Sequence, residues 1–383
     1  MDERTLCITG IGLVTTWGRG AGAAWEALAG RRPAGRRWVP DDGPPAAFAA
    51  ALPDEYEPHP SIPARIAPLL DRGGAIALDA ALQAVETAGF GPGSADARRF
   101  GVVDALAYRA PGQPTLYVPY GQTVARALGI RGPVLTVGGG EAASASAIAL
   151  AARLVAEGEV EVALAGGAQA LQQPLIAHLR ELGAAEGPAR PFDRSHAGFV
   201  PGEGAAYVVL ERLEHAAARG REPLACIVGA GTTFDSSAEP FAFADPSESG
   251  RALQAALADA GYLQGQVDLV VSGADGRVQR DFCEGYALRR TFGRHAYYAS
   301  VTAPAGSLGT PLAAQGAVAV AVAVECLARQ QVPPIAGFEE PEPDLELGYA
   351  RELRAERLDC VLVTSFAPGG ASVALLLERP HRP

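Results

Sequence analysis

The chain has 383 residues and a mass of 39.4 kDa, which suggests two domains or one large duplicated unit. Its composition, 48% hydrophobic and 20% charged, is typical of a packed globular protein and excludes disorder as the main state. The net charge of −11 argues against nucleic acid or an anionic membrane as the partner, and the absence of lysine excludes Schiff-base chemistry and a P-loop lysine.

The five cysteines are scattered and odd in number, so we expect neither a zinc site nor a disulfide framework. The sequence opens directly with strand-like residues rather than with a signal peptide. The longest apolar stretch, residues 316–328, contains Glu325 and is too short to cross a bilayer. These features predict a soluble cytoplasmic protein that carries no metal and no cofactor.

Alternating strand and helix patterns predict an α/β fold for the first half of the chain. Its predicted elements are, in chain order, strand 7–12, a helix ending at 81–90, strand 100–103, strand 133–137, helix 141–157 and strand 206–212. Residues 31–64 are rich in Pro, Ala and Arg and lack clear periodicity, so we expect them to form a surface excursion without a chemical role.

The second half repeats this order. Its predicted elements are strand 226–231, helix 252–262, strand 267–271, a helix over 312–330 that is apolar nearly all round and therefore buried, and strand 374–379. The hexapeptide CITGIG at 7–12 recurs as CIVGAG at 226–231. Self-similarity in a fixed order indicates two related halves, predicted as domains 1–220 and 221–383.

Three segments resemble the β-ketoacyl-ACP synthase family. They are ITGIGLVT at 8–15, AGGA at 165–168, and the region 191–205, which contains PFDR followed by GFVPGEGA. The resemblance extends from Leu6 to about Glu378 and so covers nearly the whole chain. It implies the thiolase fold, in which two duplicated halves form five layers in the order αβαβα.

Members of that family use a cysteine at a helix N-terminus, two histidines and a lysine. Aligned on the family's motifs, the cysteine position holds Glu141, the first histidine Gly273, the lysine Ala305 and the second histidine Thr310. A carboxylate is a weak nucleophile and lacks the sulfur that thioester transfer needs. The helix dipole is expected to keep Glu141 ionised or bonded to backbone N–H groups. The resemblance therefore implies a retained scaffold with no catalytic residue.

A retained scaffold with an erased site resembles the chain length factor, or ketosynthase β subunit, of type II polyketide synthases. In that subfamily the inactive subunit forms a heterodimer with an active ketosynthase, closes the far end of the partner's acyl tunnel, and meets the acyl carrier protein through the complex. The resemblance places gating at the dimer interface, with Tyr108 at the tunnel floor and Leu116, Tyr117 and Tyr120 close by in sequence. A bulky ring there shortens a tunnel by excluded volume.

Several alternatives remain open at this point. Glu141 could be an ordinary acidic residue at a helix N-terminus, or it could support decarboxylation of malonyl-ACP to an acetyl primer. The chain could instead be a homodimeric ketosynthase-like scaffold. Tyr108 could be a packed interface aromatic without a gating role. The sequence does not distinguish an aromatic product from a reduced polyene.

Overall fold

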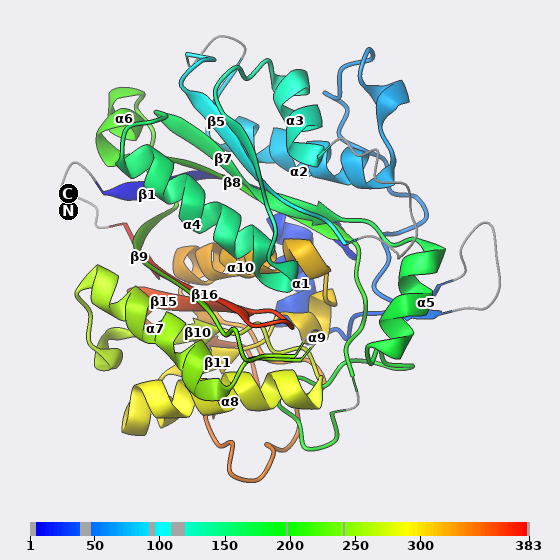
Figure 1. The fold of residues 1–383 in the computed structure, drawn as a ribbon, viewed down its shortest axis with the longest axis vertical. Helices are drawn as coiled ribbons and strands as arrows, with labels where there is room; N and C mark the ends of the chain where they lie inside the picture. Colours follow the sequence, from blue (N-terminus) through cyan, green and yellow to red (C-terminus); the bar gives the residue numbers. More distant parts are fainter. Residues whose placement is uncertain are drawn as a thin grey trace.

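The computed structural model describes residues 5–38, 47–91, 96–108, 119–196, 198–239 and 242–380. One continuous hydrogen-bonded path of strands runs through these residues in the order β13-β11-β10-β15-β16-β9-β1-β8-β7-β5-β6. The two halves of the chain meet where β1 pairs with β9 in antiparallel register, Cys7 lying opposite Cys226. Figure 1 shows this arrangement in the colours of the sequence.

The first half of the chain contributes one set of five strands and the helices that connect them. These elements are β1 (Leu6–Thr15), α2 (Arg72–Thr87), β5 (Phe100–Ala105), α3 (Tyr120–Leu128), β6 (Val134–Val137), α4 (Ala143–Ala156), β7 (Val162–Gln169) and β8 (Gly204–Arg212). From β1 outward the pairings are antiparallel to β8, antiparallel to β7, and then parallel to β5 and β6.

The second half repeats the same order. Its elements are β9 (Ala225–Phe234), α7 (Pro246–Ala260), β10 (Leu269–Val271), α8 (Val278–Phe292), β11 (Ser300–Thr302), α10 (Gln315–Arg329), β15 (Cys360–Phe366) and β16 (Ala371–Glu378). From β9 outward the pairings are again two antiparallel and then two parallel. The strands and helices predicted from the sequence are therefore confirmed, and the structure repeats the topology that the hexapeptides indicated.

The remaining described elements flank or connect these strands and helices. They are β2 (Gly18–Arg19), α1 (Ala21–Ala29), β3 (Arg36–Trp38), β4 (Ala47–Ala49), α5 (Gln173–Glu181), α6 (Leu213–Ala218), α9 (Ala305–Leu308), β12 (Gln331–Val332), β13 (Gly348–Tyr349) and β14 (Arg354–Ala355), with 3₁₀ turns η1 (Ala67–Leu69), η2 (Gly140–Ala142), η3 (Gln264–Gln266), η4 (Gly293–Tyr297) and η5 (Leu312–Ala314).

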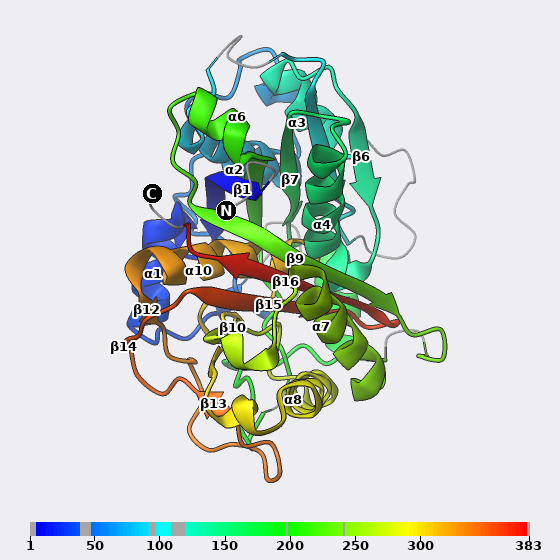
Figure 2. The same ribbon diagram turned by 90° about the vertical axis from the view of Figure 1, so that its left-hand side faces the viewer.

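The elements stack in five layers. In Figure 1, α2 and α3 lie above the strands of the first half, α7 and α8 lie below the strands of the second half, and α4 and α10 lie between the two sets. Figure 2, turned by 90°, shows the same order from the side. The thiolase-type αβαβα architecture predicted from the resemblance is confirmed, with α4 and α10 as its central layer.

Caps explain where the outer helices begin. The Asp71 carboxylate accepts a hydrogen bond from the Gly74 N–H and caps α2, and Asp245 accepts one from the Ser247 N–H and caps α7. Helix α7 ends at Gly261, whose φ of 69° is a left-handed conformation that glycine adopts without strain. The equivalent helices of the two halves thus start in the same chemical way.

Helix α10 lies in the largest hydrophobic core of the protein. The stretch Leu312–Arg329 is long and apolar enough to cross a membrane by composition alone, but 83% of it is buried inside the protein. Its valines and alanines pack with α4 and with the inner faces of both sets of strands. The nearly uniform hydrophobicity of this helix therefore follows from its place in the central layer.

One expectation is corrected by the structure. Residues 31–64 were expected to form a surface excursion, yet residues 49–52 are at most 1% exposed. The Ala50 N–H donates to the Pro201 carbonyl, and the Leu52 N–H donates to the buried carboxylate of Glu203. Because small residues can pack against a loop without showing any period, the apolar part of this segment was not recognisable from its sequence.

Candidate active site

A cavity of about 300 Å³ opens at the start of α4. Its walls are mostly apolar and come from Leu179, Leu182, Phe199, Phe243, Val278 and Pro368. The polar side chains of the lining are those of Tyr108, Glu141, Arg277 and Gln279. The cavity therefore lies where the resemblance places the family's reacting cysteine.

The backbone before α4 turns sharply and brings Glu141 to this cavity. Gly139 and Gly140 have φ values of 138° and 61°, which only glycine adopts without strain. They lead from β6 into η2, and Glu141 is the middle residue of that turn. Its side chain is only 2% exposed, so its charge needs partners inside the protein.

The partners are two arginines from the far half of the chain. Arg277 Nη2 lies 2.6 Å from Glu141 Oε2, and Arg280 Nη1 pairs with the same oxygen. Asp275 completes the group, because its Oδ2 lies 2.6 Å from Arg277 Nη2 and 3.1 Å from Arg280 Nη1. We call Glu141, Asp275, Arg277 and Arg280 the charge quartet. Fully ionised, it carries no net charge.

This arrangement corrects one of the two alternatives expected for Glu141, which was bonding to backbone N–H groups. The carboxylate is bonded to guanidinium groups rather than to the backbone N–H groups at the start of α4. Arg280 is fully buried and also contacts Gln315, whose amide oxygen lies 3.0 Å from Arg280 Nη1. A buried ion pair with several hydrogen bonds strongly resists removal of one partner, because the other charge would be left uncompensated.

A buried carboxylate fixes the loop that carries the arginines. Asp281 Oδ1 accepts hydrogen bonds from the backbone N–H groups of Asp275 and Gly276, each at 3.1 Å. Its Oδ2 accepts from the Phe192 N–H and lies 3.3 Å from His196 Nδ1. The contact with Asp281 raises the pKa of His196. Asp281 is thus structural, and it positions the start of α8 against Glu141.

The charges of the quartet support one another. Burial favours the neutral form of Asp275, but the charges of Arg277 and Arg280 outweigh it and hold the pKa of Asp275 below its ordinary value. Burial likewise lowers the pKa of Arg277, and the nearby Asp275 and Glu141 raise it above the ordinary value. Asp275 and Arg277 are therefore charged near neutral pH.

Gly273, the residue predicted at the first histidine position, has no space for a side chain. A Cβ on Gly273 would lie 2.8 Å from Arg280 Nη2 and 2.8 Å from Glu284 Oε1. Arg280 therefore occupies the space into which a side chain at 273 would point. Thr310, at the second histidine position, is fully buried, and its hydroxyl donates to Asp275 Oδ2 at 3.4 Å.

Ala305, the residue predicted at the lysine position, is buried at the start of α9. Its methyl group offers neither a charge nor a hydrogen bond. Among the four altered positions, Glu141, Gly273 and Thr310 all contact members of the charge quartet or approach them closely. The structure thus brings three of the four predicted positions around one cluster.

Tyr108 lies beside Glu141. Its hydroxyl would be 2.8 Å from a Cβ on Gly140, and it lines the same cavity. The buried Gln169 holds its backbone from both sides, because Gln169 Oε1 accepts from the Tyr108 N–H at 2.8 Å and Gln169 Nε2 donates to the Tyr108 carbonyl at 3.1 Å. Burial raises the pKa of Tyr108, so its phenol is neutral.

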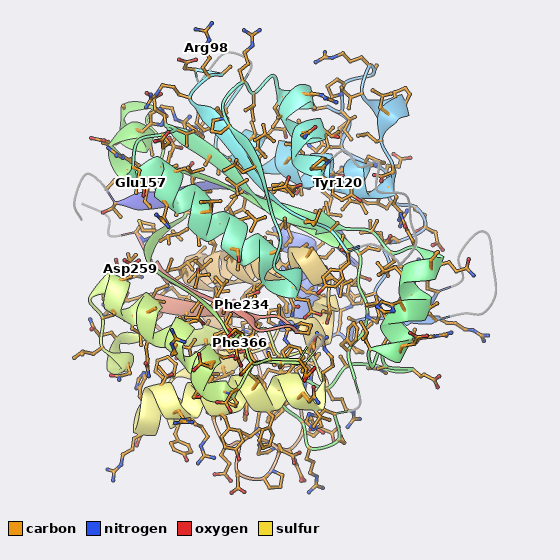
Figure 3. All side chains as sticks on the ribbon, viewed as in Figure 1. Arg98, Tyr120, Glu157, Phe234, Asp259 and Phe366 are labelled. Carbon is orange, nitrogen blue, oxygen red and sulfur yellow. The ribbon has the colours of Figure 1, made fainter. Side chains whose placement is uncertain are left out.

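The other residues expected near the tunnel floor are placed differently. Tyr120 begins α3 and packs on α2, where a Cβ on Gly73 would lie 1.9 Å from its hydroxyl. Figure 3 shows Tyr120 in the upper part of the molecule, apart from Phe366 near the middle. Leu116 and Tyr117 lie outside the described residues. Tyr108 is therefore the one member of this set that the structure describes beside Glu141.

Sequence reasoning missed Arg277 and Arg280. They are separated from Glu141 by 136 and 139 positions, so no local pattern connects them. A signal was nevertheless present. A carboxylate at a buried helix N-terminus needs a cation, and the chain has no lysine. Arg277 and Arg280 lie four and seven positions after Gly273, the residue predicted at the first histidine position. Among the described residues, no group of three or more His, Cys, Asp or Glu is arranged to hold a metal ion.

Comparison with known families gives matches over most of the chain. The β-ketoacyl synthase N-terminal domain matches residues 3–216, and the β-ketoacyl synthase C-terminal domain matches residues 224–339. "Putative polyketide beta-ketoacyl synthase 1" of Streptomyces halstedii is 32% identical over 99% of both chains. Nodulation protein E of Rhizobium leguminosarum is 30% identical over 99% of this chain and 100% of that protein.

Solved structures of similar proteins superpose closely. A β-ketoacyl synthase from Burkholderia phymatum has a TM-score of 0.89 and 28% identity, covering 98% of this chain and 100% of its own. The ishigamide ketosynthase/chain length factor has a TM-score of 0.86 and 26% identity, covering 99% of this chain and 100% of its own. Both similarities extend over the two halves of the chain.

Proposed function

The chain belongs to the β-ketoacyl synthase family, and from that premise we propose that it is a non-catalytic chain length factor. It would form a heterodimer with an active ketosynthase in the cytoplasm and limit the length of a polyketide carried on an acyl carrier protein. One of the similar structures is itself named a ketosynthase/chain length factor.

One observation carries this proposal: the nucleophile position holds Glu141, locked in a buried charge quartet. Thioester transfer requires a sulfur nucleophile that is also a good leaving group, and a carboxylate shared by two guanidinium groups is neither. A buried charge with this many partners is also costly to move. The position is therefore occupied by a stable structural group.

The missing histidines support the same proposal. An active ketosynthase needs donors near the thioester oxygen to stabilise the enolate formed on decarboxylation. Gly273 offers no side chain, and Arg280 fills the space beside it. Thr310 directs its hydroxyl to Asp275 instead of to the cavity. The same losses disfavour the malonyl-ACP decarboxylase alternative, because Glu141 alone would have to replace all of these groups.

The edge of the sheet supports association with a second subunit. Strand β6 ends the strand path, and within the described part of the chain no strand pairs with its outer edge. Leu135 on this strand is 37% exposed. Because an open edge with an apolar side chain invites pairing, β6 is suited to an interface. The outer edge of β6 could pair with a second copy of this chain equally well, so the partner must be identified by experiment.

A reconstitution assay tests the proposed function. The full chain, purified alone, is incubated with malonyl-ACP and an acyl primer, and acyl-ACP species are followed by mass spectrometry. We expect neither condensation nor acetyl-ACP formation above the buffer control, and condensation only after addition of a ketosynthase from the same genome. Condensation by the chain alone would overturn the proposal. Acetyl-ACP formation that disappears in Glu141→Ala would instead support the decarboxylase alternative.

A further inference from the structure

The two cysteines that open the repeated hexapeptides meet at the junction of the two halves. Cys7 begins CITGIG and Cys226 begins CIVGAG, so they occupy equivalent places in the duplicated sequence. Strands β1 and β9 pair in antiparallel register across that junction, and the register sets these two residues directly opposite each other. The duplication therefore brings together two thiols that are 219 positions apart in the chain.

The geometry of this cysteine pair suits a disulfide bond. The two Sγ atoms lie 3.3 Å apart, and both cysteines are free and fully buried. Directly opposite residues of antiparallel strands have Cα atoms about 4.5–5.5 Å apart, which is inside the range that disulfides span. A bond therefore requires the sulfur atoms to approach each other by only about 1 Å from their present separation.

Other buried cysteines have different neighbours. The Cys283 thiol bonds to the Ser249 hydroxyl. Cys360 in β15 is separated from Cys226 by strand β16, whose Glu378 lies opposite both of them in the two ladders. A bridge is therefore expected between Cys7 and Cys226, whose sulfur atoms are already in contact.

The pair contains an attacking sulfur and a resolving sulfur. The hydrogen bond from Cys7 lowers the pKa of Cys226 and outweighs burial and the charge of Glu378, both of which raise it. The same bond, together with burial, raises the pKa of Cys7. Because the thiolate is the reactive form of cysteine, Cys226 is the sulfur that is oxidised first.

The position of the pair in the fold gives a small oxidant a short path. Cys7 is the second residue of β1 and follows Leu6, which is only partly buried. Figure 1 shows the start of β1 at the margin of the molecule. A molecule of the size of hydrogen peroxide therefore has little protein to cross before it reaches the two sulfur atoms.

We propose that hydrogen peroxide oxidises Cys7 and Cys226 to a reversible disulfide that joins the two halves and stabilises the fold. The Cys226 thiolate attacks one peroxide oxygen, the O–O bond breaks, and the other oxygen leaves as water. The Cys7 sulfur then attacks the sulfenic sulfur of Cys226, the S–O bond breaks, and a second water leaves. Two thiols and one peroxide thus give one disulfide and two waters, and a thiol reductant reverses the result.

The bridge acts on the weakest connection between the two halves. The ladder between β1 and β9 joins the two sets of strands and contains three residue pairs, with the cysteine pair in the middle. A covalent bond there also closes a loop of 219 positions, and long loops restrict the unfolded chain most. The inference concerns the chain by itself and so goes beyond the chain-length role.

Peroxide treatment of the folded full chain tests the proposal. The reduced chain is exposed to hydrogen peroxide, alkylated in denaturant and analysed by mass spectrometry. We expect three alkyl groups instead of five, and a peptide map that links Cys7 to Cys226. Cys7→Ser should abolish the bridge. Cys360→Ala, at a buried cysteine two strands away from β9, is the matched control and should form the bridge as the unaltered chain does.

Urea unfolding of the oxidised and the reduced chain measures the effect on stability. We expect the oxidised chain to unfold at a urea midpoint higher by about 1 M, and dithiothreitol to restore the lower value. Absence of the linked peptide from the unaltered chain, a bridge that involves another cysteine instead, or an oxidised midpoint no higher than the reduced one would each overturn the proposal.

The linked peptide is sought in the unaltered chain, so the test does not depend on the folding of Cys7→Ser. No partner and no acyl chain enter this experiment, so its failure leaves the chain-length proposal untouched.

Discussion

The two halves of the protein share their packing but not their chemistry. Strand β1 contacts α2 so closely that a Cβ on Gly12 would lie 1.8 Å from the Ala80 carbonyl oxygen. In the second half, a Cβ on Gly231 would lie 2.0 Å from the Ala252 carbonyl oxygen. Because the shape of this contact leaves space only for glycine, the same residue appears at the same place in both halves.

The starts of the two central helices differ. Both α4 and α10 follow a 3₁₀ turn, and Glu141 before α4 and Gln315 at the start of α10 both bond to Arg280. Only Glu141 brings a charge and faces a cavity. The comparison teaches that steric requirements repeat with the fold, whereas the buried charge of Glu141 has no counterpart at the start of α10 and is matched by residues of the other half.

Removal of Arg280 is expected to have the largest effect on the free energy of unfolding. Arg280→Met leaves Glu141 and Asp275 with one guanidinium between them, so we expect a loss of about 3–5 kcal/mol in the free energy of unfolding. Urea unfolding of the purified variant measures it. Combining it with Glu141→Gln should recover part of the loss, because one uncompensated charge is removed.

Gln315→Met is the control for this prediction, since it removes two neutral hydrogen bonds at the equivalent helix start, one from Arg280 Nη1 and one to the Gly273 carbonyl. We expect a loss of about 2 kcal/mol in the free energy of unfolding. Equal losses for Arg280→Met and Gln315→Met would contradict the view that charge distinguishes the two helix starts.

Alanine at the close strand–helix contacts tests the shared packing. Gly12→Ala and Gly231→Ala each place a Cβ within 2.0 Å of a helix carbonyl oxygen, so we expect losses of about 3 kcal/mol in the free energy of unfolding in both halves. Gly22→Ala in α1, where a Cβ meets nothing within 4 Å, should be neutral or stabilising by about 0.5–1 kcal/mol. A large loss at only one of the two contacts would show that the halves do not share this constraint.

Each half also contains one buried carboxyl group that is largely protonated at mildly acid pH. Burial raises the pKa of Asp104 in β5 and of Glu284 in α8 to about 7 each. Between about pH 5 and 7 the folded protein keeps protons that the unfolded chain has lost, so stability falls as pH rises, by up to about 1.4 kcal/mol per pH unit for each group.

Variants in which an amide replaces one of these two carboxyl groups should show a weaker dependence of stability on pH. Glu284→Gln and Asp104→Asn should each reduce the slope, measured by urea unfolding from pH 5 to 7. The exposed Glu346 provides the control, because Glu346→Gln should leave the slope unchanged. A slope that persists in both buried variants would show that other groups control the pH dependence.

The smallest expected effect concerns product length. In the heterodimer with its ketosynthase, Tyr108→Ala should shift the products toward longer chains, because a ring beside Glu141 is removed. Gln169→Leu, which removes both hydrogen bonds to the Tyr108 backbone, should give a smaller shift in the same direction. Mass spectrometry of released products measures both. Unchanged lengths in Tyr108→Ala would place the floor of the tunnel elsewhere.

The sequence predicted the fold because the fold depends on local patterns. The repeated hexapeptides carry the glycines of the close contacts, and the apolar stretch at 312–330 matches a central helix. The four altered positions were predicted by alignment on the motifs of the family that the chain resembles. The arginines that occupy the site did not, because their contacts join residues 136 and 139 positions apart. The boundary at residue 220 and the gating role of Tyr108 stay predictions.

Native mass spectrometry of the full chain, produced together with a ketosynthase from the same genome that carries the cysteine and both histidines, tests the central claim most directly. The account predicts a one-to-one complex whose condensing activity is lost when the partner's cysteine is replaced. A stable homodimer of this chain that excludes the ketosynthase would contradict the account.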